Sequence, residues 1–269
     1  MTDGLVKYEL IAQNQQQLEQ LCTRIAATDK PEQPSARKAF YINAYNLLAI
    51  QQVVDQYPVE SPQAIEGFFD GITHTVHGQR VTLDKLEHEL LFREFPDARL
   101  HFALICAAKG CPPMKPAAYQ PEWLDVQLEQ QTRKALSDSA FVRHQPGNRT
   151  VRLSPILNWY RDDFLQNAPS LLAYINQYRE KNLPSDSRLG FYDYDWSLND
   201  KPVEPANTQT AGDSISQDLV RQSGGYILDK GGVEVILFNN LYTQEQFFTA
   251  SGETVKLNDR TSFYAGIVE

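Results

Sequence analysis

The residues best suited to chemistry lie in one stretch, from His101 to Pro113, which reads HFALICAAKGCPP. Its apolar opening predicts a buried strand, in which successive side chains face opposite sides of a sheet. His101 and Cys106 would then point in opposite directions and could not form a hydrogen-bonded pair. The small residues that follow, with the permissive backbone of Gly110, can turn the chain and bring Cys111 back toward His101. A thiol beside an imidazole is the minimum for an activated cysteine nucleophile, so Cys111 and His101 are the candidate pair.

Other interpretations of the cysteines stay open at this point. A free cysteine is often only packed in the core, which is the expectation for Cys106 and for Cys22 on an N-terminal helix. The loop could also hold a peptide or small ligand without catalysis. Cys106 and Cys111 could form a thiol redox pair or, with His101 or His88, a zinc site. The C-x4-C spacing is wider than a usual zinc knuckle and no second pair follows, so we expect no metal and no cofactor.

Carboxylates supply a candidate third member for the site. Residues 83–92 predict a short helix whose buried stripe includes Glu87, and a buried carboxylate needs a partner or a raised pKa. That partner could be an arginine or a backbone amide, or Glu87 could orient His101 as part of a triad. Asp162 and Asp163 are adjacent on a later helix, where side chains diverge by about 100°, so they form a poor carboxylate dyad.

Two further residues could assist the same chemistry. Asn43 falls on the apolar stripe of the helix predicted after Ser35, together with Asn46. A buried amide needs hydrogen-bond partners, so Asn43 could clamp a neighbouring loop, orient a catalytic loop or donate to an oxyanion. Lys109 could lower the pKa of the Cys111 thiol if its ammonium group points inward.

Apolar periodicity and turn residues predict an α+β fold, with helices packed on a small mixed or antiparallel sheet. Helices are expected over residues 5–27, from Ser35 to about Tyr57, from Leu83 to Phe92, from Pro121 to about Leu136, after Ser154 and from Pro169 to Tyr178. Strands are expected in a hairpin over residues 72–81, from His101, over residues 150–153 and from Arg188 to Trp196.

Composition limits the classes of function. The chain has 269 residues, is 42% hydrophobic and 22% charged, and carries a net charge of −9, which is ordinary for a soluble globular protein. No basic patch stands out, which argues against a nucleic-acid partner. No apolar run approaches the ~18–20 residues of a membrane-spanning helix, and the N-terminus lacks a signal-peptide pattern. The compartment stays open between a cytoplasmic protein and the mature form of an exported one.

A change in composition at residue 200 predicts the domain organisation. We expect a main α+β domain over residues 1–199, a linker over residues 200–224 and a small β-rich extension over residues 225–269. The extension ends abruptly in a strand-like run, so its edge could pair with another chain.

Five motifs occur in one order and carry a family resemblance: FYINAYN (40–46), LDKLEH (83–88), the 101–113 stretch, LSPILNWY (153–160) and YDWSLN (194–199). Together they resemble the domain of unknown function 547 family over about residues 35–199. That family looks related to papain-like and transglutaminase-like cysteine hydrolases in a rearranged strand order. The resemblance implies a cysteine–histidine site, which maps onto Cys111 and His101. Many relatives look exported, and the family's name gives no substrate.

The leading functional hypothesis is a cysteine hydrolase or acyl transferase acting on a peptide or small-molecule amide. Cys111 would be the nucleophile, His101 the general base, Glu87 the orienting carboxylate and Asn43 an oxyanion donor, with Lys109 nearby. The alternatives are a non-catalytic peptide or small-ligand binding module and a thiol redox or metal protein.

Overall fold

The computed structural model describes residues 4–145, 147, 149–202, 246–248 and 254–256. Its α-helices are α1 (Tyr8–Ala12), α2 (Gln15–Ala27), α3 (Pro34–Val54), α4 (Leu124–Ser137), α5 (Ile156–Trp159), α6 (Arg161–Leu165) and α7 (Leu171–Gln177). Two 3-10 helices, η1 (Pro62–Ala64) and η3 (Ala98–Phe102), and the π-helix η2 (Lys85–Phe92) complete the helical elements of the described chain. The strands are β1 (His74–Val76), β2 (Gln79–Val81), β3 (Val142–His144), β4 (Thr150–Leu153), β5 (Arg188–Phe191), β6 (Gln246–Phe248) and β7 (Thr254–Lys256).

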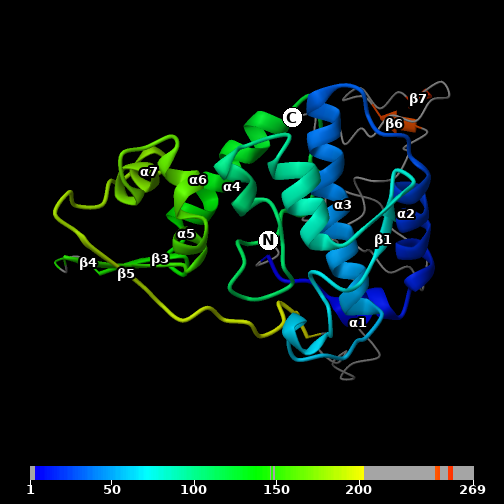
Figure 1. The fold of residues 1–269 in the computed structure, drawn as a ribbon, viewed down its shortest axis with the longest axis horizontal. Helices are drawn as coiled ribbons and strands as arrows, with labels where there is room; N and C mark the ends of the chain where they lie inside the picture. The colour runs from blue at the N-terminus through cyan, green and yellow to red at the C-terminus, as the bar shows by residue number, and fades with distance from the viewer. Residues whose placement is uncertain (1–3, 146, 148, 203–245, 249–253, 257–269) are drawn as a thin grey trace, which may run out of the picture.

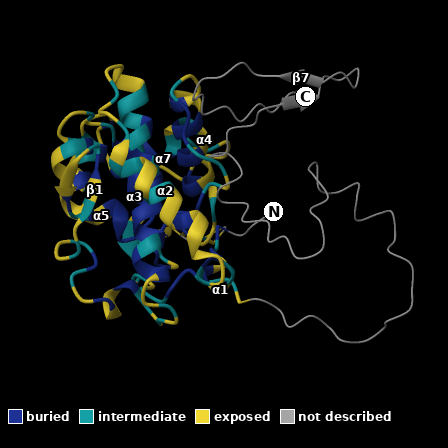
Figure 2. Cartoon of the chain, turned by 90° about the vertical axis from the view of Figure 1, so that its right-hand side faces the viewer, coloured by how far each residue is buried: buried dark blue, intermediate teal, exposed yellow. Residues whose placement is uncertain are grey.

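α3 is the central helix of the larger hydrophobic core (Figures 1 and 2). It begins at Pro34, a residue that suits a first helical turn because the backbone donor it lacks would be unpaired there. Nearly every side chain from Tyr41 to Val54 is buried, as expected of a helix covered on all sides. α1, α2 and η2 pack against it. α3 is therefore a rigid platform for the loops that rest on it.

A second core lies around the sheet formed by β3, β4 and β5 and the helices α5, α6 and α7 (Figure 1). β3 pairs with β4 antiparallel and β5 pairs with β4 parallel, so the sheet is mixed. β1 and β2 form the predicted hairpin, with the turn at His77 and Gly78. The predicted α+β class is confirmed, and the papain-like arrangement stays a proposal.

The strand predicted from His101 is wrong. Residues 98–102 form η3, which the side chain of Asp97 caps by accepting a hydrogen bond from the Arg99 amide. The reason is that a short apolar run is equally compatible with a buried helix and a buried strand. Leu100, His101 and Phe102 are all buried, at 0%, 5% and 0% exposure, so no alternation between faces is required of them.

Other boundaries differ from the expectation in smaller ways. Residues 5–27 form two helices and not one, because the helical conformation is interrupted between Ala12 and Gln15. The helix predicted over residues 83–92 is present as the π-helix η2. The strand predicted up to Trp196 ends at Phe191.

The segment after β5 crosses back to the N-terminal half of the molecule and fastens the two ends of the described domain. It is the yellow trace in Figure 1 that runs from the small sheet toward α1. The Val6 amide donates to the Asn199 carbonyl at 2.9 Å, and the Tyr8 hydroxyl donates to the Asn199 side chain at 2.9 Å. Tyr57 adds a hydrogen bond to Asp200.

Beyond residue 202 the structure describes only β6 and β7, which pair antiparallel. The rest of the predicted linker (200–224) and of the predicted extension (225–269) lies outside the described residues. Among the described helices, none has both the length and the apolar character needed to cross a bilayer.

Candidate active site

One pocket of about 300 Å³ brings together most of the predicted site residues. Cys106 and Cys111 line it from the loop after η3, His101 from η3 itself and Glu87 from η2. Asn43 and Lys109 do not contribute to its lining. Much of the remaining wall is aromatic, from Tyr45, Phe69, Trp159, Tyr160, Tyr194 and Trp196.

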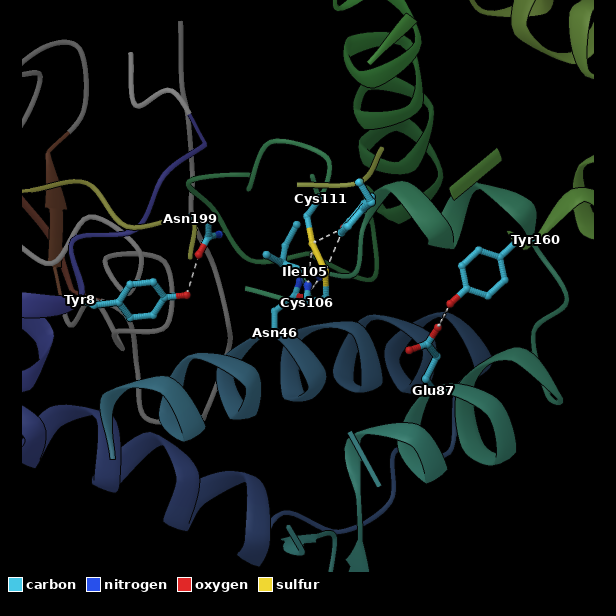
Figure 3. The surroundings of a disulfide bond; sticks show 9 residues. Tyr8, Asn46, Glu87, Ile105, Cys106, Cys111, Tyr160 and Asn199 are labelled. Atoms are coloured by element: carbon cyan, nitrogen blue, oxygen red, sulfur yellow. Dashed lines mark hydrogen bonds between the residues drawn. A yellow bond between two sulfur atoms is a disulfide. The ribbon is translucent and has the colours of Figure 1, made fainter. Parts of the chain in front are cut away.

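Cys106 and Cys111 are joined by a disulfide bond, with their Cα atoms 6.4 Å apart (Figure 3). The prediction that Cys106 faces away from the site is therefore wrong, because it depended on a strand that the chain does not form. The Cys106 amide also donates to the Cys111 sulfur at 3.0 Å. The Tyr194 hydroxyl lies 3.1 Å from the Cys106 sulfur and 3.3 Å from the Cys111 sulfur. The Cys111 sulfur therefore has two hydrogen-bond donors, the Cys106 amide and the Tyr194 hydroxyl.

The chain just before the first of these cysteines is held by a side chain of α3. The Asn46 side chain donates to the Ala103 carbonyl at 2.9 Å and accepts from the Ile105 amide at 2.9 Å. One buried amide thus gives the extended chain the pair of hydrogen bonds that a neighbouring strand would supply. Figure 3 shows Asn46 and Ile105 beside the disulfide.

The returning segment holds the loop between the two cysteines. The Lys109 amide donates to the Ser197 carbonyl and the Gly110 amide to the Asp195 carbonyl, both at 2.8 Å. A Cβ on Gly110 would come within 2.6 Å of the Tyr194 ring, so this position requires a glycine. The loop between the two cysteines is therefore held by backbone hydrogen bonds to the returning segment, and the residues just before Cys106 are held by the Asn46 side chain.

His101 is held by a carboxylate that the sequence did not suggest for it. Its Nε2 lies 2.7 Å from an oxygen of Asp163, on α6. Its ring stacks between Phe92, at 4.4 Å, and Tyr160, at 3.8 Å between ring centroids. Burial lowers the pKa of His101 to about 4, although the hydrogen bond with Asp163 acts in the opposite direction. The imidazole is therefore neutral at physiological pH.

Glu87 is nearly buried and bonds to tyrosines. The Tyr160 hydroxyl donates to it at 3.4 Å (Figure 3). Tyr45 is a second hydrogen-bond partner. Burial raises the pKa of Glu87, against the opposing effects of His88 and of the tyrosine hydrogen bonds. Within the described residues, Glu87 makes no hydrogen bond to His101, so an orienting role for it stays a prediction.

Asn43 and Lys109 lie outside the pocket. Asn43 clamps a neighbouring loop, because its side chain donates to the Tyr119 carbonyl at 2.8 Å and accepts from the Tyr119 amide at 2.9 Å. Lys109 is exposed on the loop between the cysteines. Its charge contributes to lowering the pKa of Asp195, after the hydrogen bonds that Ser197 makes to that carboxylate.

Asp163 and Tyr194 are the two contacts of this site that sequence reasoning missed. Asp163 was considered only as a partner for its neighbour Asp162, whereas its partner lies 62 residues earlier in the chain. Tyr194 belongs to the YDWSLN motif, which follows β5. This motif was the sequence signal that could have pointed to Tyr194.

A metal site would require several ligand side chains close together. In the part of the chain that the structure describes, no group of three or more His, Cys, Asp or Glu side chains is arranged to hold a metal ion. Cys106, Cys111 and His101 line one pocket, and Asp163 contacts His101 from outside its lining.

Comparison with known proteins identifies one family. Neither the curated proteins nor the solved structures include a match to this chain. The matched family segment contains α3, η2, η3 and the cysteine loop, and it ends before Asp163 and Tyr194. Residues 31–135 match the family described as "Protein of unknown function, DUF547", which supports the predicted resemblance over that part of the chain.

Proposed function

We propose that the protein is a cysteine-dependent hydrolase or acyl transferase that acts on an amide or thioester-like bond, with Cys111 as its nucleophile. The observation that carries this proposal is that Cys111 and His101 line one pocket, while the His101 ring is held by Asp163. A thiol, an imidazole and a carboxylate in this order resemble the triads of papain-like hydrolases, and a relation to them is part of the proposal.

The first step is reduction of the disulfide. An external dithiol gives two electrons and two protons to Cys106 and Cys111, and is itself oxidised to a disulfide. When Cys111 later loses its proton, the thiolate accepts hydrogen bonds from the Cys106 amide and the Tyr194 hydroxyl. These donors favour the charged sulfur, which is the nucleophilic form.

His101 is suited to move the proton in the second step. Donation from its Nε2 to Asp163 leaves Nδ1 as the basic nitrogen, and Nδ1 has no hydrogen-bond partner among the described residues. Cys111 gives its proton to Nδ1 and attacks the substrate carbonyl. His101 then protonates the leaving group, and water or an acceptor nucleophile releases the acyl group from sulfur. Asp163 stabilises the imidazolium that forms between these steps.

A second candidate function is thiol–disulfide exchange. The observation that favours it is the disulfide itself, since Cys106 is partly exposed and lines the same pocket as Cys111. In this reaction an external thiolate attacks one sulfur to form a mixed disulfide and releases the other cysteine as a thiolate. A second external thiol then attacks the mixed disulfide, which leaves Cys106 and Cys111 reduced and the two external thiols joined as a disulfide.

An acyl-trapping experiment tests the proposal and separates it from the second candidate. The reduced protein is treated with a chromogenic acyl ester, and each cysteine peptide is examined by mass spectrometry for a thioester. We expect the adduct on Cys111, its loss in Cys111→Ala, and its retention in Cys106→Ser and in Cys22→Ser, the matched control. Disulfide exchange requires both loop cysteines, so it would be lost in Cys106→Ser as well. Absence of any adduct at Cys111 would overturn the hydrolase proposal.

A further inference from the structure

The pocket around Cys111 has a pronounced charge bias. None of its lining residues, within the described chain, is a lysine or an arginine. Two carboxylates line it: Glu87, which is 9% exposed, and Asp84, whose side chain is 56% exposed. Asp84 contacts His88, whose Nε2 lies 3.5 Å from a carboxylate oxygen. A negatively charged ligand would therefore find no fixed positive charge in this wall.

Aromatic rings form the exposed side of the same pocket. The Trp159 and Tyr194 ring centroids are 4.8 Å apart, those of Tyr194 and Trp196 are 4.7 Å apart, and Trp159 and Trp196 stack at 6.1 Å. Phe69 extends this group by an edge contact with Trp196. Trp159 remains 50% exposed and lines the pocket, so part of its ring is open to a ligand there. Trp159 comes from α5, Tyr194 and Trp196 from the returning segment and Phe69 from the turn before β1, so the rings converge from separate parts of the chain.

We propose that this pocket selects acyl substrates that carry a positively charged ammonium group, which binds against Trp159, Trp196 and Asp84. The inference rests on the proposed function, because it assigns a substrate class to the Cys111 site. A cation is attracted by the negative face of an aromatic ring, and tryptophan is the strongest of the aromatic residues in this respect. Asp84 adds a direct charge attraction. A volume of about 300 Å³ accommodates one such group together with the acyl carbon.

Charged alkylating reagents provide a direct test on the reduced protein. Three iodoacetamides of similar size carry a trimethylammonioethyl group, the uncharged 3,3-dimethylbutyl group or a sulfoethyl group. In each case the Cys111 thiolate forms a thioether and iodide leaves. Each rate is divided by the rate of the same reagent with a free small thiol. We expect the cationic reagent to label Cys111 at least about tenfold faster than the anionic one, the lower end of the range for electrostatic steering.

Substitutions with matched controls test whether Asp84 and Trp159 cause the preference for the cationic reagent. Asp84→Asn and Trp159→Leu should each reduce the ratio of cationic to uncharged rates. Glu89→Gln removes the same charge from the same helix, and Trp123→Leu removes a tryptophan that is 60% exposed; neither side chain lines the pocket, so neither change should alter the ratio. The inference would be overturned if all four variants kept the wild-type ratio, or if the wild-type protein showed no charge preference.

A competition measurement keeps the test independent of variant folding. Tetramethylammonium should slow labelling of wild-type Cys111 by the uncharged reagent, whereas tert-butanol, its uncharged counterpart in shape, should not. Equal effects of the two compounds would contradict cation selection. Failure of all three reagents to label Cys111 would instead count against the proposed function, so the two failures are distinguishable.

Discussion

At the scale of single residues, the two carboxylates near His101 differ in what they can do. Asp163 contacts the imidazole at 2.7 Å and keeps 38% of its side chain exposed, so solvent supports its charge. Glu87 is buried among tyrosines, and burial raises its pKa. Stabilising an imidazolium requires a full negative charge within hydrogen-bond reach. Asp163 is therefore the better orienting group for His101, although the sequence pointed to Glu87.

Asp163→Asn should lower the reactivity of Cys111 while leaving the fold intact. Asparagine has the same shape but cannot stabilise the imidazolium, so we expect the alkylation rate of reduced Cys111 at pH 7 to fall by roughly tenfold or more. Asp162→Asn removes the adjacent carboxylate, which is exposed, and serves as the matched control. If Glu87 orients the imidazole instead, Glu87→Gln will reproduce the effect and Asp163→Asn will not.

At the scale of elements, α3 supports two loops through two asparagines three residues apart. Asn43 bonds to the backbone of Tyr119, and Asn46 bonds to the backbone of Ala103 and Ile105. The sequence showed that amides on an apolar helix face need partners. It could not name those partners, because each lies more than 50 residues away along the chain.

Asn46→Ala should therefore disturb the cysteine loop in a way that Asn43→Ala does not. Either change leaves a backbone donor and acceptor without partners, and we expect each to lower the free energy of unfolding by about 2–4 kcal/mol. Only Asn46→Ala should also change the rate at which a dithiol reduces the Cys106–Cys111 disulfide. Urea denaturation and the kinetics of thiol release give the two quantities. The same reduction rate in both variants would show that Asn46 stabilises the fold without holding the loop.

The limits of the sequence prediction have a local physical cause. The hairpin at residues 74–81 and β4 were predictable, because alternation and turn residues determine such strands locally. η3 was not, because its apolar residues are buried by two different cores and carry no periodicity. Within the candidate site, the residue pattern of the 101–113 stretch predicted Cys111, His101 and the loop that joins them. The contact between His101 and Asp163 depends on how η3 meets α6, and local sequence does not contain that information.

At the scale of the whole molecule, the candidate site lies where the two hydrophobic cores meet. η3 contributes Leu100 to the core around α3, and Ala98 and Phe102 to the core around the mixed sheet. His101 lies between these residues, and its ring stacks on one side with Phe92 of η2 and on the other with Tyr160 beside α6. Its protonation state therefore affects the junction of the two halves as well as the proposed chemistry.

This position predicts a loss of stability in acid that depends on His101. Burial lowers the pKa of His101 to about 4 in the folded protein, against about 6.5 when unfolded. Its contribution is fully present above pH 6.5, and is lost as the pH falls toward 4, because the unfolded state then binds a proton that the folded state does not. The full difference is worth up to about 3 kcal/mol.

The measurement compares urea denaturation at pH 7 and pH 4.5 for the wild-type protein and His101→Phe, with the disulfide intact so that Cys106 and Cys111 do not titrate. Phenylalanine keeps the stacking with Phe92 and Tyr160 but cannot be protonated. We expect its free energy of unfolding to fall less between the two pH values than that of the wild type. His88→Gln, which changes a half-exposed histidine, controls for the general effect of losing a titratable imidazole. Parallel losses in the wild type and His101→Phe would mean that the folded and unfolded states bind the His101 proton at the same pH, and would contradict a pKa lowered by burial.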